Sequence, residues 1–454
     1  MKKQLQIFFD FLRFCIDSTK EIPDSLKEAD WKELYAIAKK QCLVGVLFDG
    51  IKKLPAEHVG MKKELLLQWM AESQMLVKAN VRLNDAAIHV SEWFRKKGFR
   101  TCILKGQGNA LMYPNPYSRT PGDIDIWVEG GDKRVISFVR SISPHEKACY
   151  HHIEFPSYKG VEVEVHYRPS FLLCFWNNRK LQKYYERVKE EQFSHRVMLG
   201  EQGEIAIPTA EFNLIFQLTH IFSHLMNEGI GLRQLLDYYY VLCDFYKVYQ
   251  NFSKITPSLF TLKEGSTSHP DPLTLRGEGG NRPTWCSEPL RSKDGGPKRS
   301  SPNCAGWDRR DAIGDMTSAT ASTSTDTSAT AARSSFAANS SAAIDRVQEE
   351  LKELGMWKFA GGIMYIMQEV FGMPASRLIV PPNEKYGKFV LNEVLEAGNF
   401  GRHDVRNRFG RSQLGHNLQR VYRDIRLVRY FPAEALCEPL FRIWHFFWRL
   451  KYKK

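Results

Sequence analysis

Two aspartates separated by one residue, Asp123 and Asp125, stand inside an apolar run that continues through Ile126 and Val128. A short apolar run of this length, rich in β-branched residues, predicts a β-strand. Residues at i and i+2 of a strand point to the same face, so the two carboxylates share one face while Ile124 and Ile126 face a core on the other. Two acids side by side on a rigid strand repel each other unless a cation lies between them. The pattern therefore predicts a strand that holds a cation.

A glycine-containing turn lies upstream of the acids, at Lys105, Gly106 and Gly108. Glycine lets backbone N–H groups approach a phosphate closely. Arg119, just before the acids, can neutralise phosphate oxygens. Mg²⁺ takes oxygen ligands and is usually held by one or two carboxylates together with substrate phosphates. The stretch from Ile103 to Val128 therefore predicts a site for a phosphorylated substrate and its metal ion.

The stretch ILKGQGNALMYPNPYSRTPGDIDIWV resembles the nucleotidyltransferase superfamily related to DNA polymerase β. The signature of that superfamily is a glycine turn after one strand and two acids, one residue apart, on the next. The LKG…YP…R…GDIDI form is similar, more particularly, to a bacterial family of uncharacterised nucleotidyltransferases. Where the superfamily usually has Gly-Gly or Gly-Ser, this chain has Gly106-Gln107. The resemblance implies that the paired acids hold Mg²⁺, or Mn²⁺ in its place. The substrate-binding residues that it implies in this stretch are Lys105, Gly106, Gln107 and Arg119.

A second strand is predicted in VEVEVHYRP, where three valines face one way and Glu162, Glu164 and His166 face the other. The resembling transferases take a third carboxylate from a strand beside the one with the paired acids. There it helps to hold a second metal ion and can accept a proton from the attacking hydroxyl. The resemblance implies that Glu164 is this acid, with Glu162 as the alternative, and that His166 orients Glu164 or contacts phosphate. A polar outer strand face is the plain structural alternative. The implied catalytic and metal-binding residues are Asp123, Asp125 and Glu164.

The apolar helical region over residues 211–246 carries His220 and His224 on one helix face. Histidines at this spacing can bind a metal, but a zinc-protease helix has glutamate directly after the first histidine, and here that residue is isoleucine. Arg233 and Asp237, also four apart, predict an ion pair at or beneath the helix surface. A phosphate contact from one of the histidines or from Arg233 is the functional alternative.

Charge and cysteine content narrow the class of protein. A formal net charge of +13 favours an anionic partner such as a nucleotide, a nucleic acid or a membrane surface, with plain solubility as the alternative. The nine cysteines are scattered without a C-x-x-C pair, so we expect neither a disulfide framework nor a zinc site, and a reducing compartment. Asp10 and Arg13 interrupt the apolar start of the chain, and no apolar run reaches the roughly 18 residues of a membrane span. We therefore expect a cytoplasmic protein.

Changes in composition and periodicity divide the chain into four regions. Residues 1–97 predict a helical region, and residues 98–250 contain the catalytic core with its strands and adjoining helices. Residues 251–343, rich first in Gly, Pro and Ser and then in Ser, Thr and Ala, predict a disordered low-complexity insertion. Helical spacing resumes over residues 344–454. The predicted fold class is α+β, a small mixed nucleotidyltransferase-type sheet flanked by helical N- and C-terminal regions.

Two basic segments lie in the last quarter of the chain. The glycine-rich loop GNFGRHDVRNRFG, residues 398–410, can reach an acceptor or a phosphate, and a plain surface loop is the alternative. The C-terminal PLFRIWHFFWRLKYKK combines aromatic and basic residues. We expect it to dock its aromatic face on the domain, with contact to an anionic membrane surface as the alternative.

These features predict a metal-dependent enzyme that moves a nucleoside monophosphate from a nucleoside triphosphate to an acceptor hydroxyl or phosphate and releases pyrophosphate. The acceptor stays open among a small molecule, a protein and RNA. A nucleotide-binding or regulatory protein without turnover is one alternative, favoured by the altered glycine pair and disfavoured by the intact acids. A basic nucleic-acid-binding protein is another, favoured by the charge and disfavoured because no strand interleaves aromatic and basic residues.

Overall fold

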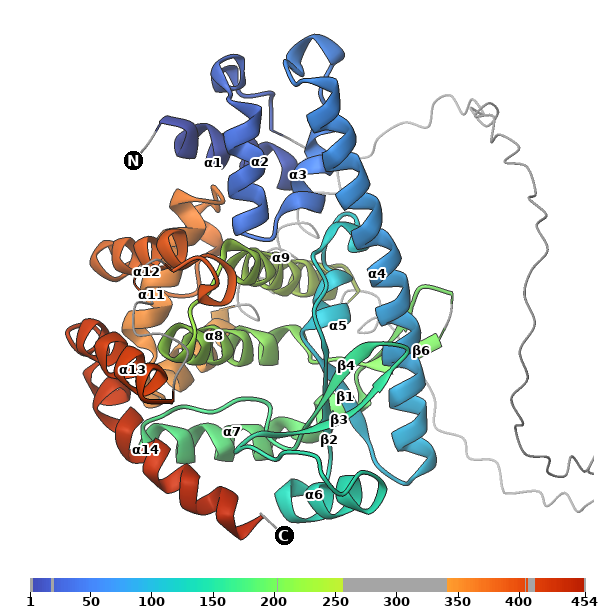
Figure 1. Cartoon of the computed structure of the whole chain (residues 1–454), viewed down its shortest axis with the longest axis vertical. Coiled ribbons are helices and arrows are strands. Elements are labelled where there is room, and N and C mark those ends of the chain that lie inside the picture. The colour runs from blue at the N-terminus through green and yellow to red at the C-terminus, as the bar shows by residue number, and fades with distance from the viewer. Residues whose placement is uncertain are drawn as a thin grey trace, which may run out of the picture.

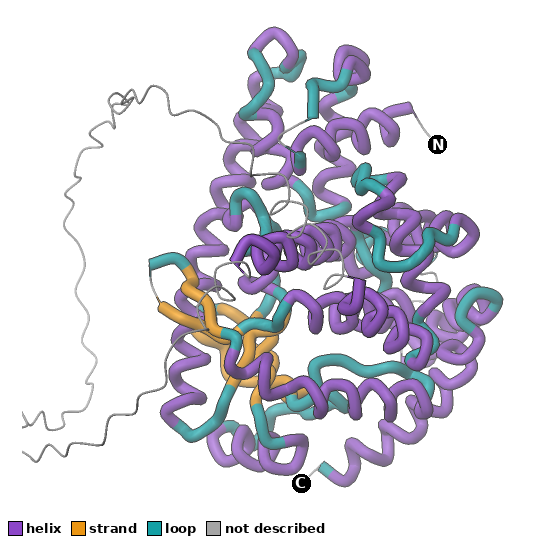
Figure 2. The backbone as a smooth tube through the Cα atoms, turned by 180° about the vertical axis from the view of Figure 1, so that it is seen from behind, coloured by secondary structure: helices purple, strands orange, loops and turns teal. Residues whose placement is uncertain are grey.

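The protein is helix-rich and contains one small mixed sheet, in agreement with the α+β class. The computed structural model describes residues 3–17, 20–201, 203–255, 341–404, 406 and 413–452. The long helix α4 runs past the sheet on one side of the molecule, and the last helices lie on the other side (Figure 1). Seen from behind, the strands gather at one side and are surrounded by helices (Figure 2).

The N-terminal region is helical, as the apolar spacing predicted. Its second helix begins at a cap in which the Asp30 carboxylate accepts hydrogen bonds from the backbone N–H groups of Lys32 and Glu33. The helices are α1 (Lys3–Ile16), α2 (Trp31–Lys40), α3 (Val44–Ile51) and α4 (Lys63–Lys96), with 3-10 turns η1 (Asp24–Glu28) and η2 (Ala56–His58).

The main sheet has four strands in the spatial order β1-β2-β4-β3. β2 pairs antiparallel with β1 and parallel with β4, and β3 pairs antiparallel with β4. The strands are β1 (Thr101–Leu104), β2 (Ile124–Val128), β3 (His152–Tyr158) and β4 (Val161–His166). A separate hairpin joins β5 (Arg196–Leu199) to β6 (Gly203–Ala206).

Both faces of the central strand are covered. Ile124, Ile126 and Val128 lie in one apolar cluster with Val90 of α4 and with Val135 of α6 (Gly131–Ile142). Trp127, on the opposite face, packs in a second cluster, where its ring lies 4.7 Å from that of Phe193 in α7 (Phe175–Ser194) and 6.0 Å from that of Phe212 in α8 (Ala210–Asn227). The acids of β2 are therefore carried on a strand fixed from both sides.

The second half of the fold is helical. After α8 come α9 (Leu232–Ile255), a helical segment at 341–353, α11 (Trp357–Glu369), α12 (Glu384–Ala397), α13 (Gln413–Val428) and α14 (Pro432–Lys451). Shorter turns are α5 (Gly106–Ala110), η3 (Pro116–Ser118), η5 (Ala375–Arg377) and η6 (Asn399–Gly401). A single apolar cluster contains Phe8 of α1, Phe216 of α8 and Phe359 of α11, so the N- and C-terminal helices share one core.

The predicted insertion at 251–343 lies mostly outside the described residues. Helix α9 continues to Ile255, and helical backbone is present again from residue 341. None of the helices in the described ranges is long and apolar enough to cross a membrane. The seven cysteines within those ranges are all free thiols.

The C-terminal helix α14 docks through part of its aromatic face. The Phe441 ring stacks on Phe171 at 5.3 Å and meets Tyr150 edge-on at 5.5 Å. Leu436 and Phe447, on the outer side of the same helix, are 65% and 63% exposed. Docking therefore covers only one side of the helix, and contact of the outer side with a membrane stays a prediction.

Asp424 of α13 is buried beside Glu438 of α14. Burial, and next the charge of Glu438, raise the pKa of Asp424 to about 7. The folded state then binds more protons than the unfolded state between about pH 4 and pH 7, so this group lowers the free energy of unfolding as pH rises through that interval. We expect Asp424→Asn to raise the unfolding free energy at pH 8 by roughly 1–3 kcal/mol and to flatten its pH dependence. Urea unfolding at several pH values checks this. Asp345→Asn, at an exposed site, should show the same dependence of unfolding free energy on pH as the wild type. If Asp424→Asn also showed the wild-type pH dependence, the expectation would be contradicted.

Candidate active site

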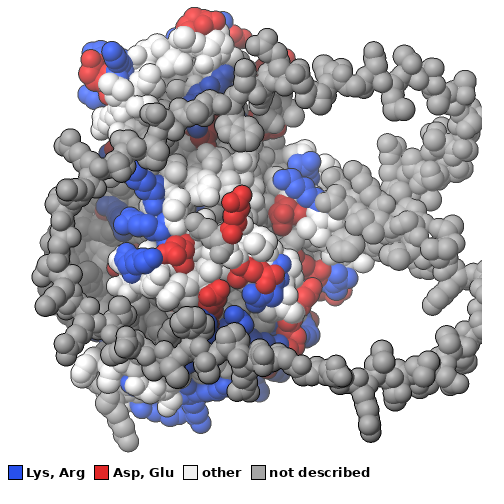
Figure 3. Space-filling view, turned by 90° about the vertical axis from the view of Figure 1, so that its right-hand side faces the viewer, with Lys and Arg blue, Asp and Glu red and all other residues white. Residues whose placement is uncertain are grey.

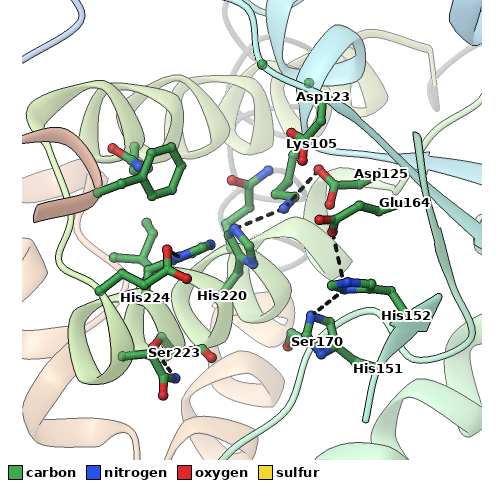
Figure 4. Close-up of a pocket in the computed structure, with 18 of the residues that line it drawn as sticks. Lys105, Asp123, Asp125, His151, His152, Glu164, Ser170, His220, Ser223 and His224 are labelled. Atoms are coloured by element: carbon green, nitrogen blue, oxygen red, sulfur yellow. Dashed lines mark hydrogen bonds and ion pairs between the residues drawn. The ribbon is translucent and has the colours of Figure 1, made fainter. Parts of the chain in front are cut away.

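A cavity of about 610 Å³ opens where the sheet meets α8, the start of α9 and the loop after α12. Lys105, Asp123, Asp125 and Glu164 form one side of it, and His220 and His224 of α8 project from another (Figure 4). The larger cavity in the described part of the chain, of about 880 Å³, lies elsewhere, against α7 and α9. It lacks the paired acids, so the chemistry points to the first cavity.

The three acids predicted from the sequence are brought together. Asp125 lies in β2 directly opposite Glu164 of the parallel strand β4, and Asp123 immediately precedes β2. One carboxylate oxygen from each of the three lies within 4.8 Å of the others. Glu162, the alternative to Glu164, is exposed and does not line the cavity. The structure therefore favours Glu164 as the third acid.

Asp125 is the most buried of the acids, at 5% exposed, and it has two cationic neighbours. Its Oδ1 lies 2.8 Å from Nε2 of His166, and its Oδ2 lies 3.0 Å from Nζ of Lys105. Burial alone would raise the pKa of Asp125, but Lys105 and His166 outweigh it and hold that pKa well below its usual range. Asp125 is therefore ionised at neutral pH.

Asp123 has the opposite balance. Repulsion from the Asp125 carboxylate, with burial adding to it, raises the pKa of Asp123 to about 6. It forms no ion pair with any residue in the described ranges. A cation placed between the two aspartates would remove this repulsion. Carboxylate oxygens are the ligands that Mg²⁺ prefers, so the donor set fits that ion.

His166 bridges two of the acids. Its Nε2 lies 3.4 Å from Glu164 Oε2 as well as close to Asp125, while its Nδ1 lies 3.3 Å from the backbone oxygen of Arg168. Burial would lower the pKa of His166, but the two carboxylates outweigh it and raise the pKa to about 9. The ring is 2% exposed. His166 is therefore a buried imidazolium in contact with two carboxylates, and its role in orienting Glu164 stays a prediction.

The glycine turn positions Lys105. β1 ends at Leu104, and Lys105 and Gly106 adopt positive φ angles of 52° and 43° before α5 begins. A lysine rarely occupies this region of backbone space, and here it directs its Nζ to a point 3.0 Å from both Asp125 Oδ2 and His220 Nε2. The Gln107 side chain is placed differently from the expectation: it is buried, donates to the Asn84 oxygen and does not line the cavity.

Arg119 lines the cavity as expected of a site residue, but its guanidinium is paired with an acid. Its Nε and Nη2 each donate to Asp237 at 2.8 Å, and Tyr113 donates to the same carboxylate at 2.7 Å. The guanidinium is 3% exposed and is committed to this pair, so Asp237 rather than phosphate neutralises it. The predicted pair between Arg233 and Asp237 was wrong. Arg233 donates instead to the backbone oxygen of Thr120 at 3.0 Å. This hydrogen bond and the pair between Arg119 and Asp237 both fix the loop that leads into β2.

The two histidines of α8 share one face, as the spacing predicted. Their rings lie 4.3 Å apart, His220 contacts Lys105, and His224 Nδ1 lies 3.3 Å from Glu228 Oε2. Phe400 and Arg402, from the basic loop after α12, line the same cavity. The loop therefore reaches the site.

One group of residues was missed by sequence reasoning. Cys149 and His151 lie just before β3, and His152, the first residue of that strand, contacts Glu164. The run Cys-Tyr-His-His directly before a strand was the available signal. It was not recognised because the pairing of β3 beside β4 could not be read from the sequence.

Comparison with known proteins gives one match. Residues 27–251 match the model of a family described as an uncharacterised nucleotidyltransferase. That segment contains β1–β4, α8 and most of α9, and so all the acids of the site. The match supports a nucleotidyl-transfer role. No curated protein and no solved structure matches the chain.

The buried pair between Arg119 and Asp237 gives a test of the scaffold. We expect Asp237→Ala to lower the unfolding free energy by about 3–5 kcal/mol, because it leaves the Arg119 charge buried without a partner. Urea unfolding followed by circular dichroism measures this. Asp85→Ala, which breaks an exposed pair with Lys159, serves as the control and should cost about 0–1 kcal/mol. Equal effects of the two variants would contradict the expectation.

Proposed function

We propose that the protein is a nucleotidyltransferase of the polymerase β-like kind, which transfers a nucleoside monophosphate from a nucleoside triphosphate to an acceptor hydroxyl or phosphate. The observation that carries this proposal is the convergence of Asp123, Asp125 and Glu164 beside a cavity, within the segment that matches the family. Two acids on one strand and a third on its parallel neighbour are the arrangement that the resemblance implies.

Asp123, Asp125 and Glu164 would hold the divalent ion. Bound there, Mg²⁺ or Mn²⁺ would neutralise the triphosphate and the charge that develops on the leaving pyrophosphate. The oxygen-only donor set supports one of these hard ions over a softer metal. The raised pKa of Asp123 supports a cation at the same place, because repulsion from Asp125 is its largest cause.

Lys105 and Gly106 would bind the triphosphate. In the nucleotide-free arrangement Lys105 Nζ contacts Asp125 and His220, and it is 15% exposed at the edge of the cavity. A triphosphate entering the cavity would offer this ammonium group stronger, multiply charged partners. Further positive charge comes from Arg233 and Arg402, which line the cavity with Lys105. These cations, with a metal ion on the acids, would neutralise an anionic substrate.

The transfer step would use an acceptor oxygen as nucleophile. That oxygen attacks the α-phosphorus in line, the bond from this phosphorus to the bridging oxygen breaks, and pyrophosphate leaves with the electron pair. Glu164 would accept the acceptor's proton. Hydrogen bonding from His166 outweighs burial and lowers the pKa of Glu164, so the carboxylate is ionised and has a lone pair for that proton. His166, held between Asp125 and Glu164, would keep the two carboxylates in register as a positioning residue.

Two alternatives from the sequence lose support. A nucleotide-binding protein without turnover would rest on the altered Gly106-Gln107 pair, but the Gln107 side chain is directed into the core and leaves the acids intact. A nucleic-acid-binding protein would be favoured by a broad basic surface. On the face in Figure 3 the described lysine and arginine side chains are interspersed with acidic ones. The site chemistry thus favours the enzyme.

The four α-labelled nucleoside triphosphates test the function directly. We expect the full chain with Mg²⁺ and a cell extract as acceptor pool to give a labelled product with at least one of them, and Asp125→Asn to give none. Size fractionation and treatment with nuclease or protease then separate a small molecule, RNA and protein as the acceptor. Nucleotide binding without product under Mg²⁺ and Mn²⁺ would favour the non-catalytic alternative, and no binding at all would overturn both.

A matched pair of variants on β4 tests the third acid. We expect Glu164→Gln to lower the rate of transfer by about 10²–10⁴-fold, the range for loss of a general base. Glu162→Gln, two residues away and outside the cavity, should leave the rate within about twofold of the wild type. Initial rates at saturating nucleotide measure both. A larger loss for Glu162→Gln than for Glu164→Gln would reverse the assignment.

A further inference from the structure

A cluster of nitrogen and sulfur donors lies directly beside the three acids. Nε2 of His151 is 3.1 Å from Nδ1 of His152, and that same Nδ1 is 3.2 Å from Oε2 of Glu164. Sγ of Cys149 is 3.5 Å from the other ring nitrogen of His151. Figure 4 shows the two histidines below Glu164, with their contacts drawn as dashed lines.

The separations around His152 suit a four-coordinate metal ion that takes His151 through Nε2, the nitrogen facing His152. Zinc–nitrogen bonds of 2.0–2.1 Å at tetrahedral angles place neighbouring donors about 3.3 Å apart. The distances from His152 Nδ1 to its two neighbours, 3.1 and 3.2 Å, are within a few tenths of an ångström of that value. One ligand atom each from Cys149, His151 and His152 also lie within 4.8 Å of one another.

The donors differ in kind from those of the carboxylate site. Thiolate and imidazole favour zinc and similar transition metals, whereas Mg²⁺ favours oxygen. A thiol that binds a metal does so as the thiolate, so metal binding at Cys149 would release a proton.

The cluster is reachable from two sides. Cys149 and His152 line the cavity that holds the acids, and they also line a second cavity, of about 640 Å³, beside the C-terminal helix α14. A metal ion therefore has an entry path that does not cross the carboxylate site.

We propose that Cys149, His151 and His152 form a transition-metal site of the zinc class, with its open coordination position facing Glu164. The three ligands of this site differ from the acids that would hold magnesium, and the site does not require the proposed function to be correct. A metal bound there would share the Glu164 carboxylate with the catalytic acids. It would thereby fix the position of the group that accepts the acceptor's proton.

Cobalt is a spectroscopic probe for this site. The full chain is first freed of metal with a chelator and placed in excess Mg²⁺, which would occupy the carboxylate site. Co²⁺ is then the only transition metal added in the titration. We expect one equivalent to give a thiolate-to-cobalt charge-transfer band and the strong visible absorption of four-coordinate Co²⁺, and one equivalent of Zn²⁺ to remove both. A wild-type protein without the charge-transfer band would overturn the proposal, whatever the variants do.

Variants assign the ligands. Cys149→Ser should lose the charge-transfer band, and His151→Gln should weaken Co²⁺ binding by at least about 100-fold, since loss of an outer partner alone costs 10–100-fold. Cys243→Ser, a partly buried cysteine of α9, is the matched control and should keep the band. Asp123→Asn should keep it too, because that acid belongs to the other site. A band that survives Cys149→Ser, or that Asp123→Asn removes, would overturn the assignment.

Discussion

Carboxylates repel one another wherever a fold brings them together, and the site of this protein is built around three that cannot separate. Asp125 and Glu164 are fixed opposite each other by the parallel pairing of β2 and β4, and Asp123 is two residues from Asp125 on the same face. Cationic groups in the rest of the site reduce this repulsion. Lys105 and His166 neutralise Asp125, while repulsion from Asp125, followed by burial, raises the pKa of Asp123 to about 6. The imbalance marks the place where a further cation would stabilise the site most.

The scaffold supports that arrangement by limiting movement on every side. The apolar side chains of β2 pack against α4 and α6 on one face and against α7 and α8 on the other, so the strand cannot shift to relieve the repulsion. The loop before β2 is fixed by the buried pair of Arg119 and Asp237, which joins it to α9. A buried ion pair contributes little net stability relative to apolar packing. Its clearer role here is to fix the position of the loop that presents Asp123.

The distribution of donors separates two kinds of chemistry within a short distance. Oxygen donors converge from β2 and β4, while ring nitrogens and a thiol converge from the start of β3. Glu164 lies between the two groups and contacts both His152 and His166. Because Glu164 contacts both sets of donors, a change of charge among the nitrogen and sulfur donors can change the position of the carboxylate beside the two aspartates. That position explains why the proposed base and the proposed second metal site depend on the same strand pairing.

The sequence by itself determined the local features of the site: strands with period-two alternation, the shared face of Asp123 and Asp125, and the helical regions around them. These follow from spacing, which is a property of neighbouring residues, whereas the choice of Glu164 over Glu162 as the third acid came from the family resemblance. Only the tertiary structure decided the partners. Asp237 binds Arg119 from 118 residues away, where four-residue spacing predicted Arg233. The Gln107 side chain is directed into the core, and His152 at the start of β3 contacts Glu164. Such contacts depend on strand order and helix packing, which bring distant segments together without leaving a periodic signal in the chain.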